Sequence, residues 1–313
     1  MEKNVTVNNW STFFSIKNTV LDRIIISSGL RLDQNDYENN SLLSPRLNID
    51  LQLMNLTNLI FTAGIYRQNP PEIYLSIKEN NLKSIQSIQQ SISMERALGE
   101  SSNLTLSLYQ KEIINAPLLG KNDQFEDPSF LLDELKLYSG IESTGISMTR
   151  GVEILLQKKR AHNFYGLIGA TYYNSTFKDI NGKIRNRNYN YKYIFNIVGG
   201  YRPNNKMELS IRWSYFGGRP YTEINTIASH FSQEQVIFTN NFNENRTPEY
   251  HNLFIRYEKR AILEKANLIL YIEFWNAYNR KNIETYFWSE ASEKVEPVRY
   301  FDFIPIGGFE LEF

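Results

Sequence analysis

The chain has 313 residues, a length that allows one large domain or two ordinary ones. Its 34 Lys and Arg residues balance its 34 Asp and Glu residues, so the charge indicates neither nucleic acid nor an acidic partner. Because the chain has no cysteine, disulfides, cysteine-bound metals and thiol nucleophiles are excluded. We also expect neither a transmembrane helix nor a signal peptide, since no sufficiently long apolar run is present.

The predicted elements are strands in which apolar and polar residues alternate, because a strand points successive side chains to opposite faces. The alternation is regular over 46–53, 103–111, 206–215 and 268–274. A tilted strand needs about ten residues to cross a bilayer, whereas strands of soluble proteins centre near five or six. These runs are close to the longer length. We expect roughly thirteen strands, which start near Trp10, Arg23, Arg46, Leu59, Ile85, Asn103, Gly145, Asn163, Tyr191, Met207, Pro248, Asn267 and Tyr300.

Short and long connections alternate between these strands. Short polar turns are expected at 17–22, 54–58, 99–102, 158–162, 203–206 and 260–267, and long polar loops at 33–44, 68–84, 112–143, 177–190, 218–249 and 279–298. Outer-membrane barrels have short periplasmic turns and longer extracellular loops. The sequence therefore predicts an all-β fold, an antiparallel transmembrane β-barrel. A soluble β-sandwich or propeller would also alternate, but it explains neither the strand length nor the unequal loops.

Two segments depart from the regular pattern. Gln and Ser residues interrupt the alternation after Ile85. Arg150 lies on the apolar phase of its strand, and we interpret it either as a residue at the membrane edge or as a bulge that shifts the register.

The last predicted strand, 301–313, ends on one of its own apolar residues. Its aromatic and aliphatic side chains occupy odd positions, and its carboxylates occupy even positions. Chain ends fray unless they are tied into a sheet, so we expect this segment to be a strand of the barrel wall. Its end then lies in the periplasm, and the side of every loop follows by counting backwards.

Several short motifs have the order and spacing of one known family. The strongest are 217–222 (Gly-Gly-Arg-Pro-Tyr-Thr), 246–250 (Arg-Thr-Pro-Glu-Tyr) and 276–282 (Asn-Ala-Tyr-Asn-Arg-Lys-Asn). Weaker ones lie at 29–33, 43–47, 66–71, 151–154 and 165–166. Together they resemble the C-terminal part of the barrel of TonB-dependent receptors, the plugged outer-membrane barrels that import scarce nutrients.

The resemblance implies the C-terminal portion of a barrel of about 22 strands, without the plug domain and the early strands, and hence a fragment or a truncated gene product. The last strand then lacks its natural partner, and either residues 10–16 substitute for it or the sheet stays open. The resemblance also implies the outer membrane of a Gram-negative bacterium. The implied function is active, TonB-coupled uptake of a scarce nutrient such as a siderophore, vitamin or oligosaccharide.

The resemblance also implies a set of partners. These are outer-membrane lipid, the barrel-insertion machinery, the plug domain, the inner-membrane energy-coupling complex and a small-molecule or oligomeric nutrient. Two other functions remain open on the pattern alone. One is a passive outer-membrane porin or small β-barrel, and the other is a soluble β-sheet binding protein.

The candidate site residues form three groups. Lumen candidates lie on the polar phase of late strands, where a water-filled barrel interior tunes selectivity: Glu208, Arg212, Arg256, Tyr271, Glu273 and Trp275. Rim candidates lie where strands enter long loops: Tyr66, Arg67, Gln68, Arg219 and Tyr221. The C-terminal insertion signal implied by the resemblance comprises Phe309, Leu311 and Phe313.

No catalytic chemistry is expected. His162, His230 and His251 lack the spacing of metal ligands, and we expect them to be solvated or rim residues. No Gly-rich phosphate loop leads from a strand into a helix. The sequence therefore predicts a binding and transport protein that is not an enzyme and needs neither a cofactor nor a metal.

Overall fold

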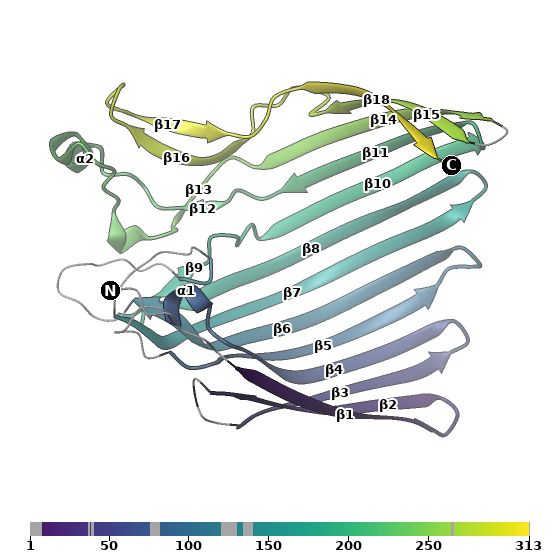
Figure 1. Ribbon diagram of the computed structural model, residues 1–313, viewed down its shortest axis with the longest axis horizontal. Coiled ribbons are helices and arrows are strands. Elements are labelled where there is room, and N and C mark those ends of the chain that lie inside the picture. The colour runs from purple at the N-terminus through teal and green to yellow at the C-terminus, as the bar shows by residue number, and fades with distance from the viewer. Residues whose placement is uncertain are drawn as a thin grey trace.

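The computed structural model describes residues 8–36, 38, 41–75, 82–119, 130–133, 140–263 and 266–312, and it consists mainly of antiparallel strands (Figure 1). The strands are β1 Asn9–Val20, β2 Ile24–Asn35, β3 Ser41–Met54, β4 Thr57–Gln68, β5 Ile85–Ala97, β6 Ser102–Leu119, β7 Ile141–Ala161, β8 Phe164–Lys178, β9 Ile184–Asn186, β10 Tyr193–Asn204, β11 Met207–Phe216, β12 Pro220–Tyr221, β13 Asn245–Arg246, β14 Tyr250–Ile262, β15 Asn267–Trp275, β16 Ile283–Ser289, β17 Lys294–Arg299 and β18 Ile304–Glu312. The helical segments are α1 Glu72–Leu75, α2 Thr226–Ser232 and the 3-10 turn η1 Thr239–Asn241. Within the described residues, none of these helices is long and apolar enough to span a membrane.

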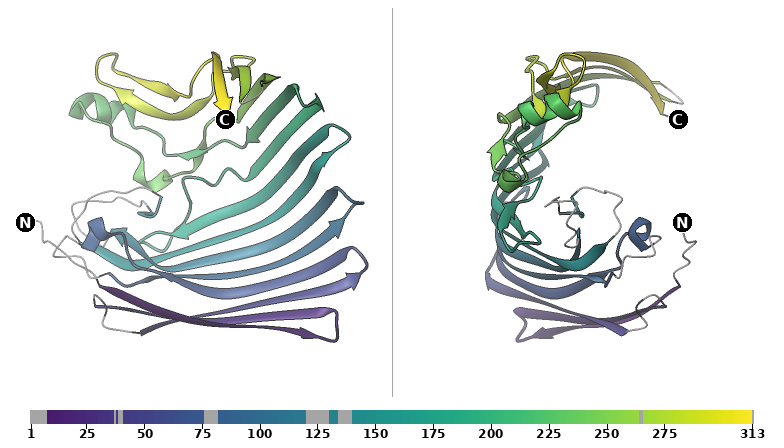
Figure 2. Two further views of the ribbon diagram at one scale, coloured as in Figure 1. Left: turned by 45° about the vertical axis from the view of Figure 1, so that its right-hand side comes forward. Right: turned by 90° about the vertical axis from the view of Figure 1, so that its left-hand side faces the viewer.

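One curved sheet makes up the wall of the molecule. It follows the order β1-β2-β3-β4-β5-β6-β7-β8-β10-β11-β14-β15-β18, and β9 pairs only with β8. The sheet curls into a C-shaped trough whose two edges do not meet (Figure 2). Among the described residues, β1 pairs only with β2 and β18 only with β15. The predicted antiparallel barrel wall is therefore confirmed, and residues 10–16 do not substitute for a partner of the last strand.

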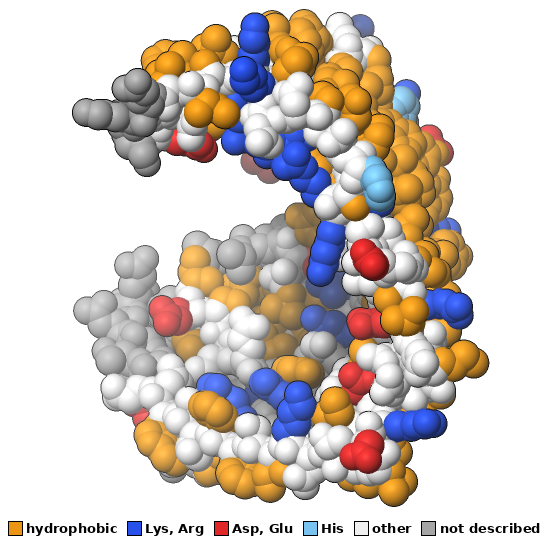
Figure 3. All heavy atoms as spheres, turned by 90° about the vertical axis from the view of Figure 1, so that its right-hand side faces the viewer, with side chains coloured by type: hydrophobic (Ala, Val, Ile, Leu, Met, Phe, Trp, Pro, Cys, Tyr) orange, Lys and Arg blue, Asp and Glu red, His pale blue; other side chains and the backbone are white. Residues whose placement is uncertain are grey.

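The convex face of the sheet is apolar and the concave face is polar. Leu209 and Ile211 of β11 and Leu270 and Ile272 of β15 point outward and expose 44%, 40%, 50% and 43% of their surface. Such exposure would be unfavourable in water but suits lipid hydrocarbon. Figure 3 looks from the short-turn end and shows Lys and Arg side chains inside the trough and hydrophobic side chains around its outside.

Aromatic side chains mark two levels on the convex face. Near the short turns, Phe164 of β8 stacks on Tyr201 of β10, with ring centroids 4.6 Å apart. Toward the long loops, Tyr193, Tyr215 and His251 stack in a row, with successive centroid distances of 5.8 and 6.1 Å. Outer-membrane barrels carry aromatic girdles at both membrane interfaces. The two levels therefore delimit the lipid-facing band of the sheet.

The short turns all lie at one end of the trough and the long connections at the other, as predicted (Figure 1). Leu21 and Asp22 both have left-handed backbone angles, with φ of 55° and 53°, and His162 and Asn163 have φ of 52° and 70°. Two-residue turns of this kind follow the right-handed twist of the flanking strands. The compact turns thus hold neighbouring strands in one register.

Three tyrosines on the concave face lie over glycines of the next strand. Tyr165 of β8 covers Gly200 of β10, and Tyr109 of β6 covers Gly151 of β7. Tyr271 of β15 likewise covers a glycine of β18, Gly308. A Cβ atom at Gly151 would lie 2.6 Å from the Tyr109 hydroxyl, and one at Gly308 would lie 2.5 Å from the Tyr271 hydroxyl. Only glycine leaves room for the rings at these places.

The long connections contain structure that the sequence did not predict. They carry α1, α2, the pairs β12–β13 and β16–β17, and two small apolar clusters. The first cluster packs Phe130 against the inward residues Ile85, Ile113 and Phe177. The second packs Leu131 against Tyr74 of α1 and Ile141. The described part of the β6–β7 connection, residues 130–133, therefore folds onto the concave side of the wall.

Some predicted strand details need correction. Pairing runs directly from Gln110 through Arg150 to Asn174, so no bulge lies at Arg150. The segment after Ile85 is a regular strand, β5, with unbroken pairing on both sides. The last strand begins at Ile304 rather than near Tyr300, because residues 300–303 still belong to the preceding connection. The loop expected at 112–143 is shorter, because β6 continues to Leu119 and β7 already begins at Ile141.

Candidate functional site

Arg256 is the centre of a charged network on the concave face of the last three wall strands. Its Nε donates to Glu258 at 2.7 Å, and its terminal nitrogens lie 3.4 Å from Glu273 and 3.5 Å from Glu310. Its guanidinium also covers the ring of Tyr271, 4.0 Å from the centroid. With these partners the charge of Arg256 is well satisfied, so the network fastens β14, β15 and β18 to one another.

The remaining lumen candidates lie on the same face. Arg212 covers the ring of Phe254 at 4.0 Å, and Phe254 packs edge-on against Trp275 with centroids 5.8 Å apart. Glu208 accepts a hydrogen bond from Tyr165. The lumen residues predicted from the sequence thus form one continuous polar and aromatic surface across β11, β14 and β15.

The three strongest sequence motifs meet at the loop end of this surface. The first two pair with each other, because Arg219 N donates to Thr247 Oγ1 at 3.0 Å and Thr247 N donates to Arg219 O at 2.9 Å. The third braces the start of β14. There, Asn282 Oδ1 accepts from His251 N at 3.1 Å, and Asn282 Nδ2 donates to His251 O at 2.8 Å. Segments far apart in the sequence therefore hold one another at the mouth of the trough.

Aromatic rings line this mouth and form what we call the mouth cluster: Tyr189, Tyr191, Phe216, Tyr250 and Tyr300. Successive ring centroids in that order lie 6.4, 5.8, 5.2 and 5.1 Å apart. Phe216 and Tyr250 are directly paired residues on the inward face of β11 and β14. The cluster therefore continues the lumen surface into the loops and offers flat faces on which a ligand can stack.

Two arginines accompany the mouth cluster. The guanidinium of Arg219 lies 5.1 Å from the Tyr189 ring centroid and 3.4 Å from Glu284. Arg246 donates through Nη1 to the carbonyl oxygens of Asn190 and Gly218, at 2.5 and 2.8 Å. Within the described part of the chain, Nη2 of Arg246 is buried without a hydrogen-bond partner. The mouth thus carries positive charge that the described carboxylates only partly balance.

Burial shifts the ionisation of these groups. It raises the pKa of Tyr191 to about 12, and the neighbouring Tyr300 adds to this effect. Burial likewise raises the pKa of Tyr300 and of Tyr221, and it lowers the pKa of the Arg246 guanidinium. At neutral pH Tyr191, Tyr221 and Tyr300 therefore remain neutral hydrogen-bond donors beside cationic side chains.

The structure separates the rim candidates into two groups. Tyr66 faces inward under the guanidinium of Arg46, 4.6 Å from the ring centroid, whereas Arg67 faces outward and donates to the Leu43 carbonyl at 3.3 Å. Gln68 ends β4 beside them. Arg219 and Tyr221 lie just after the end of β11, in the connection to β14. In the wall, β5 to β8 and β10 separate β11 from β4. Tyr221 packs there against Tyr286, with centroids 4.9 Å apart.

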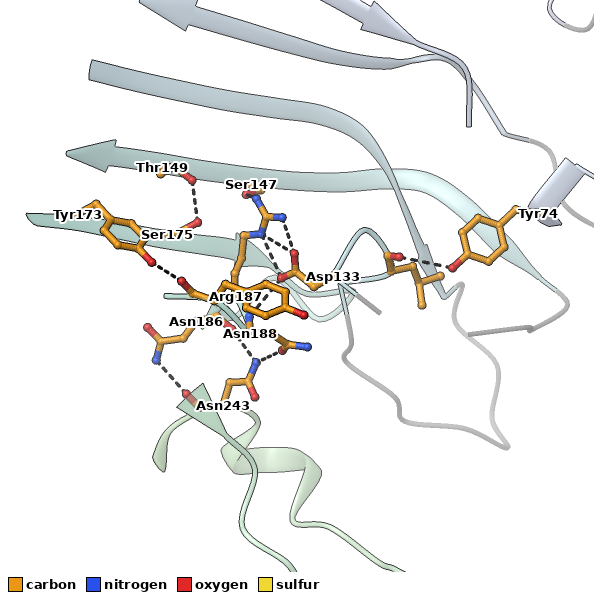
Figure 4. Close-up of polar contacts among 12 residues, drawn as sticks. Tyr74, Asp133, Ser147, Thr149, Tyr173, Ser175, Asn186, Arg187, Asn188 and Asn243 are labelled. Atoms are coloured by element: carbon orange, nitrogen blue, oxygen red, sulfur yellow. Dashed lines mark hydrogen bonds and ion pairs between the residues drawn. The ribbon is translucent and has the colours of Figure 1, made fainter. Parts of the chain in front are cut away.

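A polar cluster ties the inner loops to the wall (Figure 4). Arg187 donates through Nε to both carboxylate oxygens of Asp133, at 3.2 and 3.1 Å, and its Nη1 lies 3.5 Å from Ser147 Oγ on β7. Asn243 Nδ2 donates to the Asn186 carbonyl at 3.0 Å and to Asn188 Oδ1 at 2.6 Å. Three connections are therefore joined above the lumen by hydrogen bonds.

The remaining candidate residues lie at the sheet edge or apart from one another. Phe309 and Leu311 point outward from β18 with 74% and 47% of their surface exposed, and Phe313 lies outside the described residues. His162 lies in a turn, His230 in α2 and His251 on the convex face of β14. The described residues contain no group of three or more His, Asp or Glu placed to hold a metal ion.

Sequence reasoning missed most of the mouth cluster and all of the polar cluster. Tyr189, Tyr191 and Tyr300 lie in connections, where no periodicity indicates which way a side chain points. The signal that could have found them was the density of Asn and Tyr in 186–193, where six of eight residues are of these two types.

Several outer-membrane receptors have a similar fold at low sequence identity. The ferric-catecholate import receptor Fiu from E. coli K12 matches with a TM-score of 0.66 and 12% identity over 97% of this chain and 45% of that chain. The ferric enterobactin receptor from Pseudomonas aeruginosa matches with a TM-score of 0.66 and 14% identity, over 97% and 45% of the two chains. For the ferric preacinetobactin receptor BauA from Acinetobacter baumannii the values are 0.65, 13%, 98% and 43%.

The chain thus spans less than half the length of these receptors. At this identity the likeness shows the fold alone. No curated protein matches the chain in sequence. The family model described as "TonB dependent receptor-like, beta-barrel" matches residues 2–272. This family consists of receptors and transporters rather than enzymes. Because its model matches most of the chain, the chain belongs to the TonB-dependent receptor-like β-barrels of the outer membrane.

Proposed function

We propose that the chain provides the ligand-binding C-terminal wall of an active outer-membrane importer. The observation that carries this proposal is the mouth cluster with its two arginines, which continues directly into the polar lumen surface around Arg256. A ligand held at the mouth would meet a hydrated, aromatic-lined path along the concave face. Ligand-binding loops on a rigid wall are the usual arrangement for such a function.

The mouth favours an anionic ligand that contains flat rings or other planar groups. Arg219 is about one-fifth exposed, and its contact with Glu284 at 3.4 Å leaves donors of the planar guanidinium free. Neutral tyrosine hydroxyls add hydrogen-bond donors, and the rings add stacking faces. A siderophore complex or a vitamin fits this chemistry best. An oligosaccharide would use the rings but not the charge.

Completion of the transporter is part of the same proposal. Among the described residues, the outer edges of β1 and β18 have no paired strand, and a membrane-spanning sheet must close to satisfy such backbone groups. We propose that further strands of the same longer protein close this wall and that a plug domain of that protein fills its lumen. Phe309, Leu311 and Phe313 would be recognised by the barrel-insertion machinery, and the inner-membrane energy-coupling complex would move the plug.

Uptake in cells tests this function. A strain lacking the gene is complemented with the natural protein and supplied with iron-55 siderophores, labelled cobalamin or labelled oligosaccharides. One class is expected to be taken up, and a protonophore is expected to abolish its uptake. Arg219→Gln should reduce uptake about tenfold, because a guanidinium-to-anion hydrogen bond contributes about 1.5–3 kcal/mol.

Arg160→Gln is the matched control, since Arg160 is exposed on β7 beside a short turn, at the end of the sheet opposite the mouth cluster. It should leave uptake unchanged. Uptake that continues undiminished in the presence of the protonophore would instead identify a passive porin.

A further inference from the structure

A row of polar side chains borders the apolar convex face on the side of the long loops. Gln90, Gln110, Arg150 and Asn174 lie directly opposite one another on β5, β6, β7 and β8. All four are on the outward phase, because they alternate with inward residues such as Thr149 and Ser175, which hydrogen-bond to each other on the concave side. This row contains Arg150, the arginine that lies on the apolar phase of its strand in the sequence.

The level of this row in the membrane follows from the aromatic girdles. Asn174 lies ten residues beyond Phe164 on β8, and Tyr172 lies one outward position below Asn174. At a rise of about 3.3 Å per residue and a tilt of about 40°, this separation is about 25 Å, the height of the apolar band of an outer-membrane barrel. The row therefore lies at the headgroups of the outer leaflet, on the side of the long loops.

A groove with a volume of about 540 Å³ lies along the same strands. Its outward lining below the polar row is apolar and comes from Phe61, Ile92, Leu108, Val152 and Tyr172. Gln90, Gln110, Arg150 and Asn174 form its upper border. A hollow with an apolar floor and a polar upper end matches an acyl chain beneath a polar headgroup.

Arg150 is the cation of this border. It is exposed, and within the described residues it forms no hydrogen bond or ion pair. Glu112 lies one outward position nearer the loops, opposite Met148 in the strand register, and among the described residues no ion pair joins it to Arg150. Gln110 and Asn174 flank it directly, and Gln90 lies one strand beyond Gln110. Both glutamines offer amide donors, and Asn174 accepts from Asn190 and so keeps its own NH2 group available. An unpaired cation at the membrane surface calls for an anionic partner, and the guanidinium fork suits phosphate.

We propose that this row and groove bind a phosphate-bearing lipid of the outer leaflet. Its phosphate lies on the Arg150 guanidinium and accepts hydrogen bonds from the flanking amides, and one acyl chain fills the groove. Charge complementarity and the level of the row both favour this lipid. This site is on the outer surface of the wall and is independent of the ligand site at the mouth.

Native mass spectrometry of the natural protein, purified from outer membranes and delipidated in detergent, tests this inference. The protein is titrated with diphosphoryl lipid A and, separately, with the same lipid after removal of both phosphates. We expect one retained lipid A adduct and at least tenfold weaker retention of the phosphate-free lipid. This arm needs no substitution, and equal retention of the two lipids would overturn the proposal.

Variants then locate the site. Arg150→Gln should lower retention of lipid A at least tenfold. Arg96→Gln is the matched control, because Arg96 is also exposed and outward, on β5, but lies at the short-turn end away from the groove. It should retain lipid A like the unaltered protein.

Arg150→Lys guards against a general effect on folding. It keeps the positive charge and is expected to retain at least half of the adduct. A loss as large as that of Arg150→Gln, or an Arg150→Gln variant that binds normally, would contradict the assignment.

Discussion

Gly217 and Gly218 show how much of the mouth depends on single residues. A Cβ atom at Gly218 would overlap the carbonyl oxygen of Thr247, and one at Gly217 would overlap the carbonyl oxygen of Tyr191. Both obstacles are backbone atoms, so no side chain can move aside to relieve them. The two glycines let the β11 strand leave the wall close to the β13 segment and carry Arg219 to the mouth cluster.

We expect Gly218→Ala to open this contact. The added methyl group pushes the first two motifs apart and breaks the paired hydrogen bonds between Arg219 and Thr247, at a cost of about 1–3 kcal/mol. Thermal unfolding in detergent should show a lower midpoint. Gly307→Ala serves as the control, because its Cβ atom would lie 3.8 Å from the nearest atom, an ordinary contact. Equal midpoints for the two variants would refute the close-packing argument.

At the scale of elements, the connections of this protein are part of its structure rather than loose links. The 130–133 segment is held to the wall by the contact of Phe130 with Phe177 and by the Asp133–Arg187 ion pair. The Asp133 side chain is only 3% exposed, so loss of Arg187 would leave this buried carboxylate without an ion-pair partner. The Asp133–Arg187 ion pair thus holds the β6–β7 connection against the β8–β10 connection.

Asp133→Asn should release this connection while leaving the sheet intact. Breaking a largely buried ion pair costs about 3 kcal/mol, since the guanidinium loses its partner. Hydrogen exchange of the Asn188 amide, which donates to Asp133 at 3.2 Å, should accelerate about a hundredfold. Glu244→Gln removes the half-exposed pair with Lys183 and should change exchange little. Protection that survives Asp133→Asn would show that the apolar contacts suffice.

For the whole molecule, the open sheet has a measurable consequence. Strands in the middle of the wall have partners on both sides, whereas β1 and β18 have one partner each among the described residues. In this 313-residue chain alone, in micelles, amides on the free sides of β1 and β18 should exchange at least a hundredfold faster than those of β7. Uniform protection along the wall would mean that the edges find partners, by closure or by pairing between two chains.

The sequence predicted the wall well and the loops poorly, and the reason is physical. Alternation is imposed by lipid on one side and water on the other, so segments such as Met207–Phe216 reveal their orientation without knowledge of their neighbours. The inward placement of Arg256 and Glu273 follows from the same rule. Tyr191 and Arg187 find their partners only through contacts between distant connections, which no local pattern specifies. Arg150 is the intermediate case, because its phase was evident but its polar neighbours became adjacent only through strand pairing.

The tyrosines that cover glycines bear on how the barrel is assembled without errors. A slip of one residue turns every side chain to the wrong face, but a slip of two residues preserves the faces and would escape that control. Such a slip would place Val198 or Arg202 under Tyr165 in place of Gly200, and Ile306 or Glu310 under Tyr271 in place of Gly308. Each covered glycine therefore disfavours, by steric overlap, a register shifted by two residues during assembly of the sheet.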